Sequence, residues 1–185
     1  SLALALGTYN LRVRTVDYSG NESGNSNSIS VVVENTLPTF SGISTPVSDS
    51  YTNGTVQFTG FNGADANFRY YEYLILENGL PISFNTTAAG VTNPTITIAA
   101  PVNGNLYAVS ARAVDLAGNT SGWVNSAILG YDTSAPSAPS ITTFNDAGGV
   151  DGVSRGTVDW SAVIDSFSGL ASYDLEFSDG TNTAV

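Results

Sequence analysis

Two acidic turns recur in the sequence and offer ligands for a metal ion. Asp17 stands in TVDYSGNES and Asp115 in AVDLAGNTS, each at the end of a run of alternating apolar residues. In a structural interpretation, the carboxylate accepts backbone N–H bonds within the turn, and Gly20 and Gly118 take positive φ. In a functional interpretation, the carboxylates ligate calcium, which takes about six to eight oxygen ligands. The residues alone leave both interpretations open.

Two further acids stand in stretches that we expect to link domains. Glu34 lies just before NTLPTF and Asp132 just before TSAPSAP, whose prolines stiffen the chain and cannot enter a central strand. We expect both acids to be calcium ligands at the junctions, and the alternative is that they are solvated linker acids. Calcium is the one cofactor that the sequence suggests.

The acidic turns belong to a long internal repeat, which aligns residues near the start of the chain with residues 98 positions later. Further along, TVQF at 55–58 matches TVDW at 157–160, and YEYLI at 71–75 matches YDLEF at 173–177, at an offset of 102. The pairs at the first offset include Tyr9 with Tyr107, Asp17 with Asp115, Gly20 with Gly118, Glu34 with Asp132 and Ile43 with Ile141. A repeat of this length fits the size of an immunoglobulin-type sandwich.

Catalytic chemistry has little support in these residues. Asp174 and Glu176 share one face of an expected strand, and such a pair can hydrolyse glycosides, but the matching positions hold Glu72 and Leu74. The sequence has no His, Cys or Lys, which removes His- and Cys-dependent nucleophiles, thiolate and imidazole metal sites, and Schiff bases. We therefore predict that the chain is not an enzyme and has no catalytic residues.

Composition excludes several classes of partner. The formal net charge is −11, from 16 acidic residues and 5 arginines, so a nucleic-acid partner and an anionic membrane surface are both disfavoured. No apolar run reaches the roughly 18 residues that a membrane span needs. Only 11% of residues are charged, the chain has no thiols, and Thr and Asn are frequent. These features together indicate an extracellular location on a bacterial surface.

Short runs with period-two alternation, bounded by Gly, Asn and Pro, predict an all-β fold without long helices. In YAVSARAVD at 107–115, Tyr107 and Val109 lie on one face, and Arg112 lies on the solvent face. Other expected strands are 28–33, 55–58, 71–75, 95–99, 157–160 and 173–177. The expected core residues are Trp160, Tyr107, Tyr9, Val158 and Val109.

The order of these motifs resembles fibronectin type III and related bacterial immunoglobulin-like repeats of large surface proteins. A V-x-W strand and a Y-x-L-x-F strand are followed by Y-x-V-x-A-x-A-V-D-x-A-G-N-x-S. The resemblance implies tandem β-sandwiches with partial domains at both ends: strands E, F and G in 1–37, a complete sandwich in 38–132, and strands A, B, C and C′ in 133–185. Resemblance to calcium-rigidified adhesin repeats also permits the calcium ligands above.

Half-sandwiches expose sheet edges and an uncovered apolar face, so something must complete the two ends. In one explanation, the sequence is a window on a longer tandem array whose neighbouring repeats supply the missing strands. In the other, the C-terminal half of one copy completes the N-terminal half of the next copy, head to tail, which gives an open fibre. Both explanations remain open at this point.

The predicted function is structural and non-enzymatic: a module of an extracellular bacterial filament, adhesin stalk or surface layer, with repeats that set length and Pro-containing linkers that limit bending. The alternative is a carbohydrate-binding sandwich, because exposed aromatic rings can stack on sugars. Trp123 and Tyr70 are its candidate ligand-binding residues, with surface glycans as partners.

Overall fold

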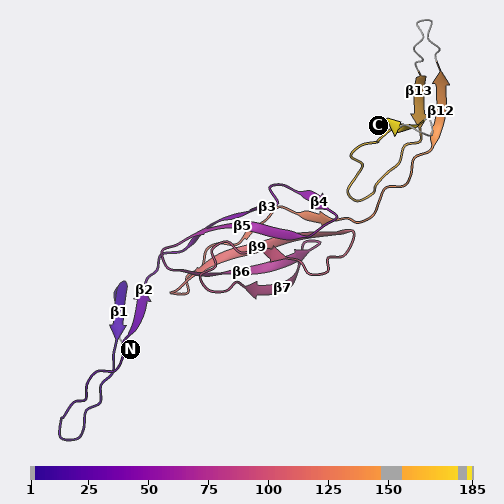
Figure 1. Ribbon diagram of the computed structural model, residues 1–185. Coiled ribbons are helices and arrows are strands. Elements are labelled where there is room, and N and C mark those ends of the chain that lie inside the picture. The colour runs from indigo at the N-terminus through magenta and orange to yellow at the C-terminus, as the bar shows by residue number, and fades with distance from the viewer. Residues whose placement is uncertain (1–2, 147–155, 179–182, 185) are drawn as a thin grey trace.

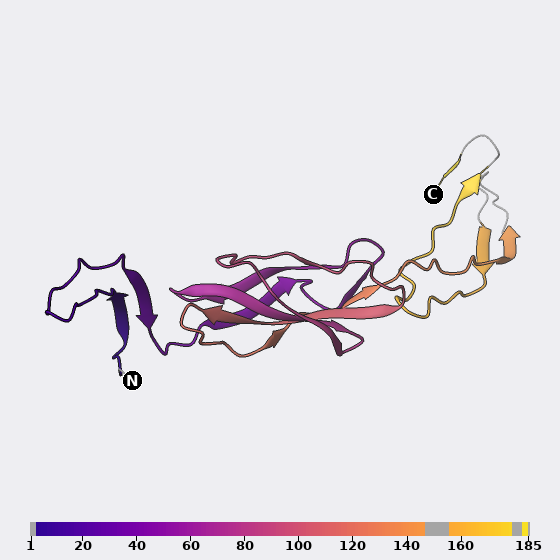
Figure 2. The same cartoon turned by 90° about the horizontal axis from the view of Figure 1, so that it is seen from below.

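The computed structural model describes residues 3–146, 156–178 and 183–184, and every regular element in these ranges is a β-strand. The predicted all-β fold is therefore confirmed. The chain is elongated, with a central two-sheet sandwich between smaller strand pairs at either end (Figures 1 and 2). This described part of the chain contains no helix long and apolar enough to span a membrane.

The central sandwich has one sheet in the order β3-β5-β8 and a second in the order β4-β11-β9-β6-β7, where β10 also pairs with β9. All neighbouring strands are antiparallel except β4 and β11, which are parallel. The strands are β3 Thr39–Thr45, β4 Ser50–Thr52, β5 Gln57–Ala64, β6 Phe68–Glu77, β7 Leu80–Thr86, β8 Ile96–Thr97, β9 Asn105–Asp115, β10 Val124–Asn125 and β11 Leu129–Tyr131.

The core lies between these two sheets, where alternating apolar residues of each strand face inward. Phe58, Tyr71, Tyr107 and Val109 are buried to 2% exposure or less. The predicted core positions Tyr107 and Val109 are thus confirmed. The outward-facing Arg112 is not simply solvated, because its guanidinium Nε bonds Glu72 Oε2 at 2.7 Å.

The two ends of the chain form separate small sheets. At the N-terminal end, β1 Gly7–Leu11 pairs antiparallel with β2 Ile29–Val33. At the C-terminal end, β12 Ile141–Asp146 pairs with β13 Gly156–Trp160, and the short strands β14 Phe177–Ser178 and β15 Thr183–Ala184 form a hairpin. Among the described residues, each end therefore has only two-stranded sheets, whereas the central sandwich has two larger sheets that face each other. The predicted domain boundaries at 37/38 and 132/133 stay predictions.

One strand and several core positions expected at the ends are wrong for this structure. Residues 173–176 are not a strand, although 173–177 was expected to form one. Trp160 is 37% exposed rather than buried, and Tyr9 and Val158 are only half-buried. The physical reason is shared: a strand needs a neighbour for its backbone hydrogen bonds, and a core side chain needs a facing sheet.

Candidate metal centre

The two acidic turns have the same hydrogen-bond geometry. Asn119 donates its backbone N–H to Asp115 Oδ1 and its side-chain amide to Asp115 Oδ2, both at 2.8 Å. Asn21 donates the same two bonds to Asp17, at 2.8 and 2.9 Å, and they lower the Asp17 pKa below its usual value. The glycine before each asparagine has positive φ, of 86° and 90°. The turn-stabilising role of both acids is confirmed, while metal ligation stays a prediction.

Three carboxylates meet at the N-terminal end of the central sandwich. Oxygens of Glu34, Asp65 and Asp115 all lie within 4.8 Å of one another. Glu34 directly follows β2, Asp65 directly follows β5, and Asp115 ends β9. The antiparallel register of β6 with β9, in which Phe68 faces Asp115, brings the last two acids to the same end of the sandwich. We call these three residues the junction triad.

Two asparagines hold the junction triad in place. The Asn67 backbone N–H donates to Asp65 Oδ1 at 2.7 Å, and its side-chain amide donates to Glu34 Oε1 at 3.1 Å. The Asn119 amide also reaches the backbone carbonyls of Glu34 and Thr36, each at 3.4 Å. The linker before β3 is thus tied to the loops that follow β5 and β9.

The chemistry of the junction triad fits a hard divalent cation. All of its side-chain donors are carboxylate oxygens, the ligands that calcium prefers, and backbone carbonyls lie beside them. Three carboxylates at this spacing repel one another unless a cation or a proton offsets their charge. Neighbouring oxygens within 4.8 Å allow one ion to contact all three groups.

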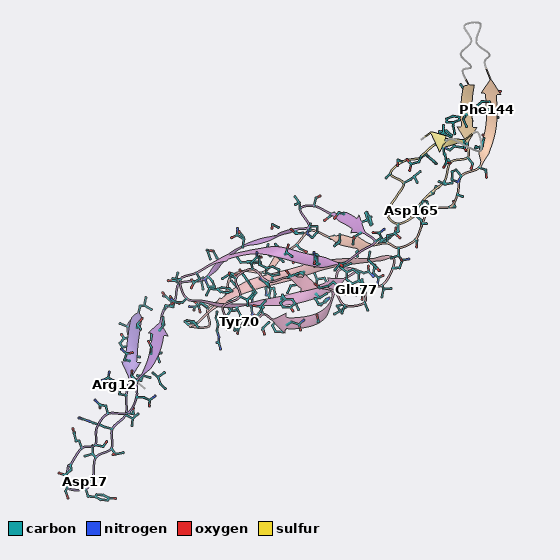
Figure 3. The ribbon with its side chains drawn as sticks, in the orientation of Figure 1. Arg12, Asp17, Tyr70, Glu77, Phe144 and Asp165 are labelled. Carbon is teal, nitrogen blue, oxygen red and sulfur yellow. The ribbon has the colours of Figure 1, made fainter. Side chains whose placement is uncertain are left out.

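Sequence reasoning found two members of the junction triad and missed the third. It predicted Glu34 and Asp115, and the structure brings them together. Asp65 was missed because a loop-length difference hid its counterpart, although an acid before strand YEYLI was the available signal. Asp17 lies far from the triad, at the tip of the β1–β2 connection (Figure 3), and Asp132 directly follows β11 at the opposite end of the sandwich.

A tyrosine near the start of β9 identifies the type of sandwich. The Tyr107 hydroxyl accepts the Val102 backbone N–H at 2.8 Å and donates to Glu77 Oε1 at 2.7 Å. A buried tyrosine that bonds the backbone a few residues upstream is the tyrosine corner of immunoglobulin-like sandwiches. Together with the sheet orders above, it decides the fold. The central unit is an immunoglobulin-like β-sandwich.

Comparisons with known proteins add little to this conclusion. No family model matches the sequence, and no curated protein matches it. A solved structure of fibronectin(III)-like modules of CbhA from Clostridium thermocellum is similar, with a TM-score of 0.43 and 20% identity. The match covers 70% of this chain and 64% of that chain, which is less than two thirds of its length.

The candidate sugar-binding residues lie on or next to strands that pair with β9. Trp123 precedes β10, and its ring contacts Phe84 edge-on at 6.4 Å between centroids, while the Arg112 guanidinium lies over the ring at 4.8 Å. Tyr70 is half-buried on β6, with the Arg69 guanidinium 5.2 Å from its ring centroid. Protein groups therefore cover part of each ring, and sugar binding stays a prediction.

The tyrosine corner predicts a measurable loss of stability. We expect Tyr107→Phe to lower the free energy of unfolding of the central unit by about 1–3 kcal/mol, because it removes a hydroxyl of a buried side chain that accepts the Val102 N–H and donates to the Glu77 carboxylate. Urea unfolding followed by circular dichroism measures this loss. The matched control is Tyr9→Phe, whose hydroxyl bonds Ala5 O in the exposed β1–β2 pair and whose loss should change stability by less than about 0.5 kcal/mol. Equal losses in both variants would contradict the assignment.

The hydrogen bond between Tyr107 and Glu77 predicts that the stability of the central unit depends on pH. Hydrogen bonds from Tyr107 and Asn105 lower the Glu77 pKa below its usual value of 4.5. The unfolded chain then binds the proton more readily, so this contribution to stability is present above about pH 4.5 and is lost as the pH falls through the lower, folded pKa. Urea unfolding of Glu77→Gln should show a shallower decline in stability on acidification than the unsubstituted chain. An unchanged decline would contradict this role of Glu77.

Proposed function

We propose that this chain is a non-enzymatic structural element of an extracellular bacterial filament or surface layer, joined head to tail by the completion of half-sandwiches. One observation carries the proposal. Positions that form the core of the central sandwich are exposed at both ends of the chain, where the internal repeat places the same residue types. The partner that fits both faces is a second copy of this chain.

The N-terminal end has an uncovered core face. Val109 and Ala111 of β9 are fully buried, whereas Leu11 and Val13, 98 positions earlier, are 52% and 71% exposed. The Tyr9 hydroxyl still bonds Ala5 O at 3.0 Å, as in a tyrosine corner. This end therefore carries the β9 and β11 part of a sandwich without the opposite sheet.

The C-terminal end has the complementary deficit. Phe58 and Tyr71 are fully buried in the central sandwich, whereas Trp160 and Tyr173, 102 positions later, are 37% and 36% exposed. These two rings contact each other, at 5.4 Å between centroids, and line an open cleft. This end therefore carries the β3 and β5 part of a sandwich without its facing sheet.

The central sandwich supports this fit, because the residues that correspond to the two end faces belong there to one hydrophobic cluster. By the same packing, β12 and β13 of one copy cover β1 and β2 of the next. Residues 173–177 then take the place of β6 beside β1, with Leu175 opposite Val13, as Tyr73 is opposite Ala111. This contact uses a different surface on each partner, so it does not close and gives an open fibre.

The composition supports an extracellular setting for such a fibre. The sequence has no cysteine, few charged residues and a net charge of −11, which favours solubility and disfavours nucleic-acid and anionic membrane partners. Load along the fibre would pass through strand pairing, and the Pro-containing linkers would limit bending. A carbohydrate-binding function has no comparable observation in its favour.

Cysteine pairing tests the proposed register directly, because the natural sequence has no cysteine. We expect the full chain with Val13→Cys and Leu175→Cys to form a covalent ladder on mild oxidation, visible on a non-reducing gel and removed by reductant. Opposite residues of antiparallel strands lie about 4.5–5.5 Å apart at Cα, within the reach of a disulfide. The two positions lie in parts at opposite ends of one chain (Figure 1), so the ladder requires separate copies.

The matched control pairs Leu175→Cys with Val47→Cys, since Val47 is 93% exposed on the central unit. It should not form a ladder beyond the background of chance collisions. A ladder of equal strength in the control, or none in the Val13 and Leu175 pair, would contradict head-to-tail completion. In the second case, the missing strands would have to come from neighbouring repeats of a longer chain.

A further inference from the structure

A buried carboxylate oxygen lacks a partner at the junction after the central sandwich. Asp132 is 8% exposed; its Oδ1 accepts the Ser134 N–H at 2.9 Å, and its own N–H donates to Thr52 O at 2.9 Å. Among the residues that the structure describes, Asp132 Oδ2 has no hydrogen-bond partner. A buried carboxylate oxygen without a partner is costly, and in native proteins it often indicates a ligand, an ion or an ordered water.

A second acid lines the same cleft. Asp132 and Asp165 both border a cleft of about 190 Å³, together with Asn103 and Ser134. Asp165 Oδ1 accepts the backbone N–H groups of the three residues 167–169, at 3.0, 2.8 and 3.2 Å. Asp165 is thus a fixed anion, which leaves its second oxygen for another contact.

These two acids repeat two members of the junction triad. Asp132 is the counterpart of Glu34 in the repeat. Asp165 corresponds to Asp65, because the hydrogen bonds around the two acids match. Each carboxylate accepts the backbone N–H of the residue two positions later, and the residue two positions before each acid donates its N–H to a tyrosine hydroxyl, of Tyr173 or Tyr71. The third member, Asp115, has its counterpart in Asp17, which shows the same hydrogen bonds from its turn asparagine.

Asp17 of the same copy cannot be the third acid. Asp17 lies at the far tip of the N-terminal part, whereas Asp165 lies beside the C-terminal end of the central sandwich (Figure 3). If residues 133–185 of one copy and 1–37 of the next form one sandwich, the Asp17 turn takes the place that the Asp115 turn has in the central unit. The three acids then converge as they do in the junction triad.

We propose that Asp132 and Asp165 of one copy and Asp17 of the next copy form a calcium site that is completed only at the head-to-tail contact. This inference rests on the proposed function. The ligands are carboxylate oxygens, which calcium prefers, and water can complete its coordination. Two chains of net charge −11 repel each other, so a divalent cation shared at their contact offsets the charge that the contact concentrates.

Sedimentation velocity on the full chain tests the site, with calcium at about 1–5 mM compared with EDTA at constant ionic strength. We expect calcium to strengthen head-to-tail association at least about tenfold, as a shared ion binds only the associated state. Asp132→Asn and Asp165→Asn each keep the Oδ1 acceptor for the local backbone, and each should lose this calcium effect.

Two control variants separate this site from other calcium effects. Asp65→Asn removes a ligand of the junction triad within one copy, and Asp49→Asn removes an acid that bonds the Ile128 N–H elsewhere on the sandwich. Both should keep the calcium-strengthened association. An equal calcium effect in Asp132→Asn and Asp165→Asn would overturn the proposed site.

The outcomes also separate this inference from the proposed function. Association of equal strength in calcium and EDTA would overturn the calcium site and leave head-to-tail completion standing. No association in either condition would overturn head-to-tail completion and the shared site together. Calcium-strengthened association that is lost only in the Asp132 and Asp165 variants supports both.

Discussion

An equimolar mixture of two variants that each remain monomeric alone is expected to form dimers and nothing larger. Trp160→Asp places a charge on the exposed core face of the C-terminal half, and Val13→Asp does the same on the N-terminal half. Each variant keeps one intact end. The intact C-terminal half of the Val13 variant can therefore join the intact N-terminal half of the Trp160 variant, and both remaining ends of that dimer are blocked.

This result follows from the geometry of a head-to-tail contact, which uses two different surfaces. Analytical ultracentrifugation of each variant and of their mixture measures the species formed. Val47→Asp, which makes the same change at an exposed valine of the central unit, should assemble as the unsubstituted chain does. Continued growth in the mixture, or dimers of either variant alone, would contradict the two-surface contact.

The second large effect concerns two aromatic residues that the repeat aligns. Phe58→Ala is expected to lower the free energy of unfolding of the central sandwich by about 3–5 kcal/mol, because Phe58 is fully buried and its loss leaves a cavity. Trp160→Ala, at the corresponding position, should cost less than about 1 kcal/mol in the isolated copy, where the ring is already 37% exposed.

Urea unfolding at concentrations low enough to keep the chain monomeric measures both values. The comparison is informative because sequence position and residue class are matched, and only the facing sheet differs. A loss of 3 kcal/mol or more for Trp160→Ala, about the lower bound for a buried aromatic, would show that the C-terminal half has a complete core within one copy.

The sequence was sufficient to predict the central sandwich because its signals are local and repeated. Alternating residues in YAVSARAVD predicted β9, and the Gly-Asn turns predicted where that strand ends. Strand 173–177 was predicted from an equally good pattern and is not formed in this structure. Its pattern is that of β6, but β6 has β7 and β9 as neighbours, whereas residues 173–176 have neither.

The candidate metal centre was only partly predictable. The acids that recur at the linkers and turns identified Glu34 and Asp115. The sequence could not show that these two lie beside Asp65 rather than beside the acids at the other repeated positions. That meeting depends on the register of β6 with β9 and on the path of the linker, both set by contacts between residues far apart in the chain.

The sequence by itself determined the residue types, their alternation and the repeat, and therefore the strands and turns of the central sandwich and the exclusion of His-, Cys- and Lys-dependent chemistry. Only the tertiary structure decided which of the repeated positions are buried and which acids converge. Burial and convergence depend on what faces a residue across the sheet or the junction. Equivalent residues such as Phe58 and Trp160 therefore differ in exposure, because Phe58 has a facing sheet and Trp160 has none among the described residues.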